Sequence, residues 1–182
     1  VHERILREVV HPTVAGIAAD GVAFTGFLYA GLMIGRDGAP KVIEYNVRFG
    51  DPETQPVMLR LDSDLVGLIE AAVDGRLAGH EAQWDPRPSL GVVMAAHNYP
   101  GTPRSGDEIS GLGDAHATDA KLFHAGTREV DGRVLTSGGR VLCACALGDD
   151  LRQAQQRAYA LAAKIRFDGE FHRSDIGWRA LK

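Results

Sequence analysis

Apolar residues along the first twenty positions recur at the spacing of an amphipathic helix. Polar side chains separate four of them: Ile5, Val9, Val14 and Ile17. This rhythm predicts a helix over residues 1–20. Pro12 has no backbone N–H to donate, so we expect the helix to kink or restart there. Because the chain begins inside this helical pattern and has no initiator Met, we expect it to be part of a longer protein.

Two apolar stretches follow that have the length and composition of strands. Residues 24–34 are apolar almost throughout, which is typical of a strand covered on both faces. Residues 41–46 form the second stretch, and the turn Arg36-Asp37-Gly38 between the two predicts a β-hairpin. One helix is then predicted over residues 55–74, where apolar side chains return at helical spacing.

The second half of the chain combines short strands with one helix. Strand patterns occur at residues 90–96, 108–110, 120–125, 134–136 and 141–147. An amphipathic helix is predicted over residues 150–165. This set of elements predicts a small α+β domain. We therefore expect three segments: 1–78, a polar, proline-containing linker 79–88, and a domain 89–182.

Composition narrows the class of protein. With 45% hydrophobic and 24% charged residues in 182, the chain has the values of an ordinary globular protein. The net charge of -4 offers no basic surface for nucleic acid, and no apolar run approaches the roughly 18 residues that span a bilayer. Cys143 and Cys145 are two residues apart in a predicted strand, which favours buried, reduced thiols over a disulfide or a zinc site. We expect a cytoplasmic protein without nucleic-acid or membrane partners.

Candidate chemistry lies in the second strand of the predicted hairpin. Glu44 and Asn46 are two apart, so both side chains leave the same face of the strand. A carboxylate and an amide oxygen are hard donors that suit Mg²⁺ or Mn²⁺. Two protein oxygens would leave coordination positions for phosphate oxygens and water. Taken alone, this alternation is also typical of a solvated strand face.

The segment after the strand adds a cation and two carboxylates. The guanidinium of Arg48 has a planar set of donors that suits phosphoryl or carboxylate oxygens. Asp51 and Glu53 follow at the strand exit, where they could accept an amine or hold a metal-bound water. The alternative for Asp51 is a turn residue that caps the next helix.

Residues 48–55 read Arg-Phe-Gly-Asp-Pro-Glu-Thr-Gln, and this string resembles the signature of the phosphoribosylamine–glycine ligases. Glu-x-Asn before it is similar to the metal-binding element of the ATP-grasp superfamily. The resemblance extends to further stretches: 25–33, 89–96, 123–127, 138–142 and 175–180. It implies the second half of an ATP-grasp domain followed by a small mixed α/β carboxy-terminal domain.

The resemblance also implies an activity in purine biosynthesis. Such a ligase joins glycine to 5-phosphoribosylamine with ATP, through glycyl phosphate, and releases ADP and phosphate. Glu44 and Asn46 would hold Mg²⁺ or Mn²⁺, Asn46 and Arg48 would contact ATP, and Arg48 would act on the transferred phosphoryl group. Asp51 and Glu53 would bind the amine substrate. The amino-terminal part of the protein would be needed as partner, so we expect this segment alone to be inactive, in a protein that is a monomer or homodimer.

Residues 29–34 depart from the pattern of many ATP-grasp enzymes, because they include no carboxylate that could serve as a further metal ligand. This departure puts a two-metal geometry in doubt. Two other functions stay open. One is a different ATP-grasp carboxylate–amine ligase or a carboxylase, and the other is a non-catalytic module of the same fold.

Overall fold

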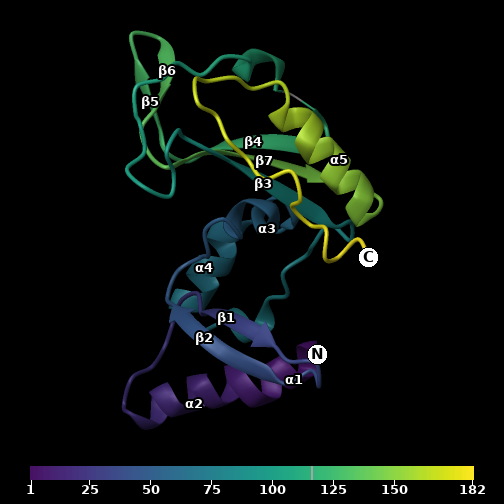
Figure 1. Ribbon diagram of the computed structural model, residues 1–182. Helices are drawn as coiled ribbons and strands as arrows, with labels where there is room; N and C mark the ends of the chain where they lie inside the picture. The colour runs from purple at the N-terminus through teal and green to yellow at the C-terminus, as the bar shows by residue number, and fades with distance from the viewer. Residues whose placement is uncertain (116) are drawn as a thin grey trace. The chain divides into compact units, whose positions relative to one another are not determined.

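The computed structural model describes residues 1–115 and 117–182. Contacts divide the chain into two units, one made of residues 1–50 and 64–82 and the other of residues 51–63 and 83–182. Figure 1 traces both units along the chain. This division reflects which residues pack together and does not test domain boundaries. The boundaries expected at residues 78 and 88 therefore stay predictions.

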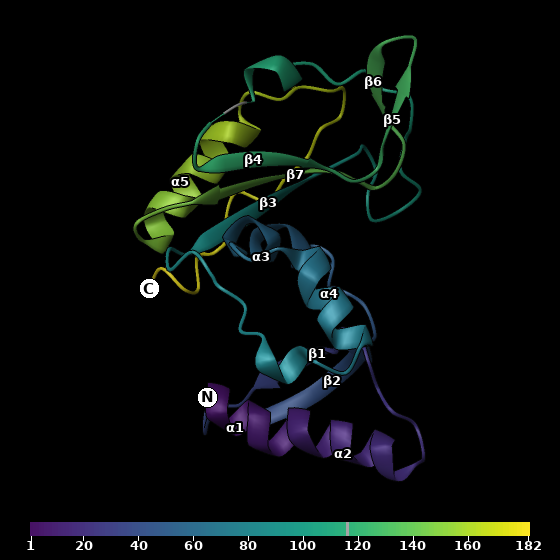
Figure 2. The same ribbon diagram turned by 180° about the vertical axis from the view of Figure 1, so that it is seen from behind.

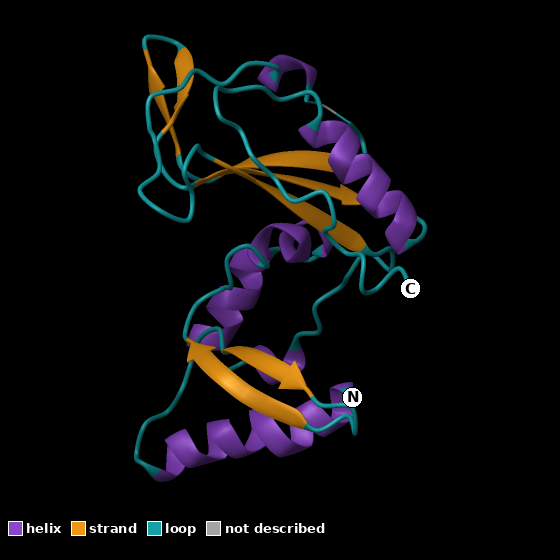
Figure 3. Ribbon diagram, in the orientation of Figure 1, coloured by secondary structure: helices purple, strands orange, loops and turns teal. Residues whose placement is uncertain are grey.

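The first unit begins with one helical stretch, as the sequence predicts. It consists of α1 (His2–Ile5), a π-helical segment η1 (Leu6–Val10) and α2 (His11–Ala19). Figure 3 draws the three as a continuous helix. The irregularity in this stretch precedes Pro12: it is a π-helical turn, in which the His11 N–H donates to the Leu6 carbonyl. Pro12 then lies in the first turn of α2, where its missing donor costs little.

The predicted hairpin is confirmed. Strand β1 (Tyr29–Ile34) pairs antiparallel with β2 (Pro40–Asn46). Within this segment β1 is partly buried at its start, whereas the side chains of Met33 and of Ile43 on β2 are 59% and 65% exposed. The π-helical segment η1 packs against strand β2 of this sheet.

The single helix predicted over residues 55–74 is wrong, because two helices occupy this stretch. They are α3 (Thr54–Arg60) and α4 (Leu65–Val73), with a short 3-10 turn η2 (Leu77–Gly79) after them. Between the helices, Leu61 adopts an extended conformation and forms a β-bridge with Trp84. Asp64 then begins α4 by accepting a hydrogen bond from the Val66 N–H. The sequence did not reveal this break, because apolar residues keep their helical spacing across it.

The second unit is built on a three-stranded antiparallel sheet. Its strands are β3 (Ser89–Ala95), β7 (Arg140–Leu147) and β4 (Ala120–His124), in the order β3-β7-β4. A hairpin of β5 (Thr127–Val130) and β6 (Arg133–Thr136) forms a separate sheet, and η3 (Leu112–Asp114) is a single 3-10 turn. Residues 108–110, predicted as a strand, form isolated β-bridges only. Helix α5 (Leu151–Ala162) confirms the predicted last helix.

Strand β7 is buried on both faces, because α5 and α3 cover opposite sides of the sheet (Figure 2). On one side, Leu142 and Ala144 belong to the same apolar core as Ala158 of α5. On the other side, Cys143 and Cys145 lie against β3 and α3, where a Cβ on Gly91 would be 3.1 Å from both sulfurs and 3.5 Å from the Pro56 Cδ. A small residue at position 91 therefore lets α3 approach the sheet.

Both cysteines are buried and free, as predicted, with their Sγ atoms 3.5 Å apart. The contact with Cys143 and burial both raise the pKa of the Cys145 thiol, so it is held protonated. In the described part of the chain, no helix has the length and apolar character needed to cross a bilayer.

Candidate functional site

Glu44 lies on β2 directly opposite Gly31 of β1. A Cβ on Gly31 would be 2.9 Å from the Cγ of Glu44 and 3.6 Å from its Oε1. The Glu44 side chain therefore lies across the hairpin, over the space that a larger residue at position 31 would fill. The sequence analysis missed this role of Gly31, and its only signal was a glycine within an apolar strand.

Asn46 pairs with Tyr29 at the end of β2. The register shifts once along the hairpin, where Gly31 pairs with Glu44 and Leu32 pairs with Val42. From Glu44 to Asn46 the pairing is regular, so the two-residue period holds there. Glu44 and Asn46 therefore share one face of the strand, as predicted.

The donors on this face fit a divalent cation of the hard, oxygen-binding type. One carboxylate and one amide oxygen are available, and the missing Cβ of Gly31 lets the Glu44 side chain lie over that position. No cluster of three or more His, Cys, Asp or Glu side chains with metal-site geometry occurs among the described residues. Two oxygen donors from one strand would leave coordination positions of such a cation for other ligands.

Arg48 lies just beyond β2 with an exposed side chain. Its Nη1 donates to the Phe49 carbonyl at 2.7 Å, and the Phe49 ring packs on Phe27 with centroids 3.9 Å apart. This aromatic pair holds the segment that follows the strand. A guanidinium has five donors, so one hydrogen bond leaves N–H groups for an anionic ligand.

Asp51 belongs to the second unit, where a side chain from β7 holds it. Arg140 Nη1 donates to the Asp51 carbonyl at 2.6 Å and lies 3.2 Å from its carboxylate Oδ2. Asp51 lies in the turn before α3, and Glu53 occupies the N-cap position of that helix without a side-chain capping bond. Sequence analysis did not foresee the partner, which is 89 residues away along the chain.

Glu53 has an exposed side chain on the rim of an open pocket of about 610 Å³. The pocket has both polar and apolar lining, from Glu53, Pro56, Val57, Arg60, Trp84 and Ser89. Glu44, Asn46 and Arg48 belong to the first unit, and Asp51 and Glu53 belong to the second. Within the first unit the structure brings Glu44 and Asn46 onto one face, and within the second it places Asp51 beside Arg140.

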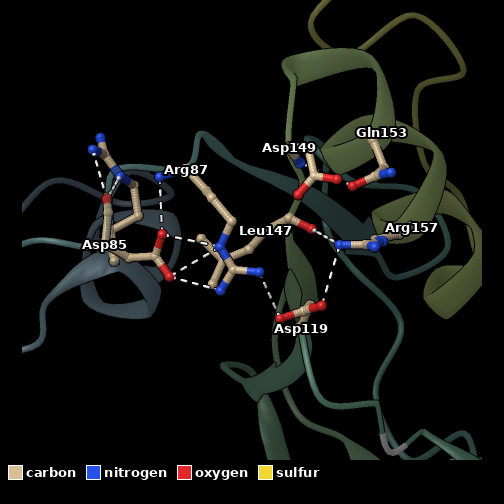
Figure 4. Close-up of polar contacts among 8 residues, drawn as sticks. Asp85, Arg87, Asp119, Leu147, Asp149, Gln153 and Arg157 are labelled. Atoms are coloured by element: carbon tan, nitrogen blue, oxygen red, sulfur yellow. Dashed lines mark hydrogen bonds and ion pairs between the residues drawn. The ribbon is translucent and has the colours of Figure 1, made fainter.

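A second polar cluster, which sequence analysis did not find, joins four segments of the second unit (Figure 4). Arg87 makes an ion pair with Asp85 at 2.7 Å and another with Asp119 at 2.9 Å. Asp119 also lies 3.3 Å from Arg157 of α5, and Arg60 of α3 donates to the Asp85 carbonyl. Hydrogen bonds from Arg87 lower the pKa of Asp85 to about 2. This cluster links α3 and α5 to the segments that precede β3 and β4, and it therefore has a structural role.

Two family models match the chain in order. The phosphoribosylglycinamide synthetase ATP-grasp (A) domain matches residues 1–54, and the C domain of the same synthetase matches residues 89–179. The chain is 65% identical over 182 residues to a phosphoribosylamine–glycine ligase of Xanthomonas axonopodis pv. citri. That match covers 100% of the chain and 42% of the relative, so the chain spans less than half the length of this enzyme.

Solved structures agree with the family matches. The crystal structure of phosphoribosylamine–glycine ligase from Thermotoga maritima is similar with a TM-score of 0.78 at 38% identity, over 97% of this chain and 43% of that one. The biotin carboxylase domain of the Hydrogenobacter thermophilus 2-oxoglutarate carboxylase has a TM-score of 0.62 at 13% identity, over 95% of this chain and 40% of that one. The second likeness shows the fold alone, and it confirms the predicted α+β class. With the C-domain model covering half of its length, the chain belongs to the phosphoribosylglycinamide synthetase family.

Proposed function

We propose that this chain is part of an ATP-dependent ligase that joins glycine to 5-phosphoribosylamine and forms glycinamide ribonucleotide, ADP and phosphate in purine biosynthesis. The observation that carries the proposal is the Glu44–Asn46 face of β2, whose Glu44 side chain lies over Gly31, next to the signature at residues 48–55. Identity of 65% to a phosphoribosylamine–glycine ligase over the whole chain supports it. The activity belongs to the full-length protein, and the segment alone is expected to be inactive.

Glu44 and Asn46 are the residues that would hold Mg²⁺ or Mn²⁺ against the phosphates of ATP. When bound, such a cation neutralises charge on the phosphate oxygens during phosphoryl transfer. The carboxylate provides the charged ligand and the amide oxygen of Asn46 the neutral one. The strand holds both donors in a fixed relation, which limits the reorganisation needed when ATP binds.

Arg48 stabilises the phosphoryl group as it moves from ATP to the carboxylate of glycine. Both reactants are anions, so a fixed positive charge is needed to bring them together. The guanidinium suits this role because it stays protonated and has donors beyond the one that binds Phe49. In the second step the amine of phosphoribosylamine attacks the carbonyl carbon of glycyl phosphate, and phosphate leaves.

Asp51 and Glu53 bind the amine end of the sugar substrate. A carboxylate accepts hydrogen bonds from an amine, and it can take up the proton that the nitrogen loses as the amide forms. We further propose a cytoplasmic enzyme, monomeric or homodimeric, with no nucleic-acid or membrane partner.

Two experiments distinguish the two other candidate functions from this one: the substrate dependence of ADP formation and metal-dependent nucleotide binding. Another ATP-grasp carboxylate–amine ligase or a carboxylase would form ADP with a different acceptor. A non-catalytic module would not bind nucleotide in a metal-dependent manner. The retained Glu44, Asn46 and Arg48 favour catalysis, because a scaffold has no use for this polar face.

The test is ADP formation by the full-length protein with Mg²⁺, glycine and freshly made phosphoribosylamine. We expect turnover to require both substrates and to be lost in Glu44→Ala. Glu70→Ala, which removes an exposed carboxylate from α4, is the matched control and should remain active. ADP formation that ignores glycine or the amine would contradict the proposal and indicate another ATP-grasp substrate.

A further inference from the structure

Arg140 is the first residue of β7, and its guanidinium binds two other segments of the second unit. Its Nη1 donates to the Asp51 carbonyl at 2.6 Å and makes an ion pair with the Asp51 Oδ2 at 3.2 Å. Its Nε donates to the Tyr99 hydroxyl at 3.0 Å. One side chain therefore connects the strand β7, the turn after β3 and the signature segment before α3.

Tyr99 is itself held close to the backbone of the same strand. Its ring lies against Gly139, where an added Cβ would collide with the ring carbons. Glycine at position 139 therefore allows the ring to pack at the start of β7, with its hydroxyl directed at Arg140. The guanidinium of Arg140 is thus engaged by both Asp51 and Tyr99.

The two bonds to Asp51 have different consequences. The bond to the carbonyl fixes the backbone at position 51, and the ion pair fixes the rotation of the carboxylate through its Oδ2. The Asp51 side chain is 55% exposed, so its carboxylate stays accessible to a ligand. A carboxylate restrained at both points loses less conformational entropy on binding than one on a free loop.

We propose that Arg140, oriented by Tyr99, is a positioning residue that holds Asp51 for the amine substrate of the ligase. This inference rests on the proposed function, because it takes phosphoribosylamine as the molecule that Asp51 contacts. Arg140 acts through Asp51 and contacts no reacting atom itself. The hydrogen bond to Tyr99 and the charge of Asp51 raise the pKa of Arg140, which therefore keeps its charge throughout the working range.

Steady-state kinetics of the full-length ligase test the effect on substrate. Hydrogen bonds to charged groups contribute about 1.5–3 kcal/mol, so Arg140→Ala should raise the KM for phosphoribosylamine by about tenfold or more. The KM values for ATP and glycine should change less than about twofold, since their proposed contacts lie elsewhere. Arg140→Lys should fall between wild type and Arg140→Ala, because an ammonium cannot match the planar set of donors.

Two further variants keep the test independent of folding. Tyr99→Phe removes only the hydroxyl, and it should raise the same KM by a smaller factor. Arg133→Ala removes an arginine of β6 that pairs with Glu108 at 3.6 Å, and it should leave all three KM values unchanged. Equal changes in every KM, or an unchanged KM for the amine in an active Arg140→Ala enzyme, would overturn the inference.

Amide hydrogen exchange of the full-length protein provides a readout that needs no activity. In Arg140→Ala, residues 50–55 should exchange faster while β3 and the centre of β7 keep their protection. Faster exchange throughout the sheet would assign Arg140 a structural role only and overturn the inference. If the wild-type ligase forms ADP without glycine or the amine, the proposed function fails, whereas exchange at residues 50–55 still reports whether Arg140 holds Asp51.

Discussion

Glu44 and Gly31 face each other across the β1–β2 hairpin, so closely that a Cβ on Gly31 would be 2.9 Å from the Glu44 Cγ. That distance is too short for two carbon atoms, so any side chain at position 31 has to displace Glu44. The proposed metal ligand therefore depends on a glycine of the neighbouring strand.

Gly31→Ala should impair metal use by the full-length ligase without unfolding it. Because the Glu44 side chain has to move, we expect the Mg²⁺ or Mn²⁺ concentration for half-maximal ADP formation to rise by about tenfold, the size of effect seen when supporting residues of metal sites are changed. Gly16→Ala is the control, because the space around Gly16 in α2 is open. A metal dependence equal to that of wild type would show that Glu44 does not need this space.

Gly111→Ala should destabilise the second unit strongly. Gly111 has a φ of 85°, and a Cβ there would collide with the Lys164 carbonyl oxygen. We expect a loss of more than about 2 kcal/mol in the free energy of unfolding, from backbone strain and overpacking together. Urea denaturation of the 182-residue chain measures it. In Gly113→Ala the added methyl group meets open space, so a loss of similar size there would contradict the explanation.

Titration of Asp85 should make the free energy of unfolding decrease at acid pH. Hydrogen bonds from Arg87 lower its pKa from 3.8 to about 2 in the folded protein. The folded state therefore favours the ionised form, so this contribution is complete above pH 4 and is lost as the pH falls toward 2. Asp85→Asn should be less stable than wild type at pH 7, with a difference that shrinks between pH 4 and pH 2. Glu81→Gln, which removes an exposed carboxylate outside the cluster, should not reproduce that profile.

Asp150 caps the amino-terminal end of α5, and its side chain accepts from the Gln153 N–H at 2.7 Å. Gln153 in turn accepts from the Asp149 N–H through its Oε1 at 2.8 Å, as Figure 4 shows. Asp150→Ala should cost about 1 kcal/mol of unfolding free energy, the usual value for a lost cap. Asp149→Ala should lower the free energy of unfolding by less, because the Asp149 hydrogen bond to Gln153 comes from its backbone N–H and is kept. Equal losses in thermal or urea unfolding would show that charge near the helix end matters more than the cap.

Local patterns predicted much of the fold. Helical spacing located residues 2–19 and α5, and apolar runs located β1, β2, β3 and β7. These patterns succeed because the periods of helix and strand are set by the backbone, and one buried face is enough to reveal them. The helix predicted over residues 55–74 failed for the same reason, since apolar spacing continued through a break that a β-bridge from Leu61 to Trp84 creates.

By itself the sequence determined the candidate metal face, because Glu44 and Asn46 are two residues apart in a strand and the signature at residues 48–55 is continuous along the chain. Packing in the tertiary structure places the Glu44 side chain over Gly31 and the guanidinium of Arg140 against Asp51. It also determines which apolar side chains of the hairpin are exposed in this segment, Ile43 among them. The physical reason is that strand alternation is a property of neighbouring residues. Arg140, the partner of Asp51, lies 89 residues further along the chain, and such a pairing depends on how distant segments pack.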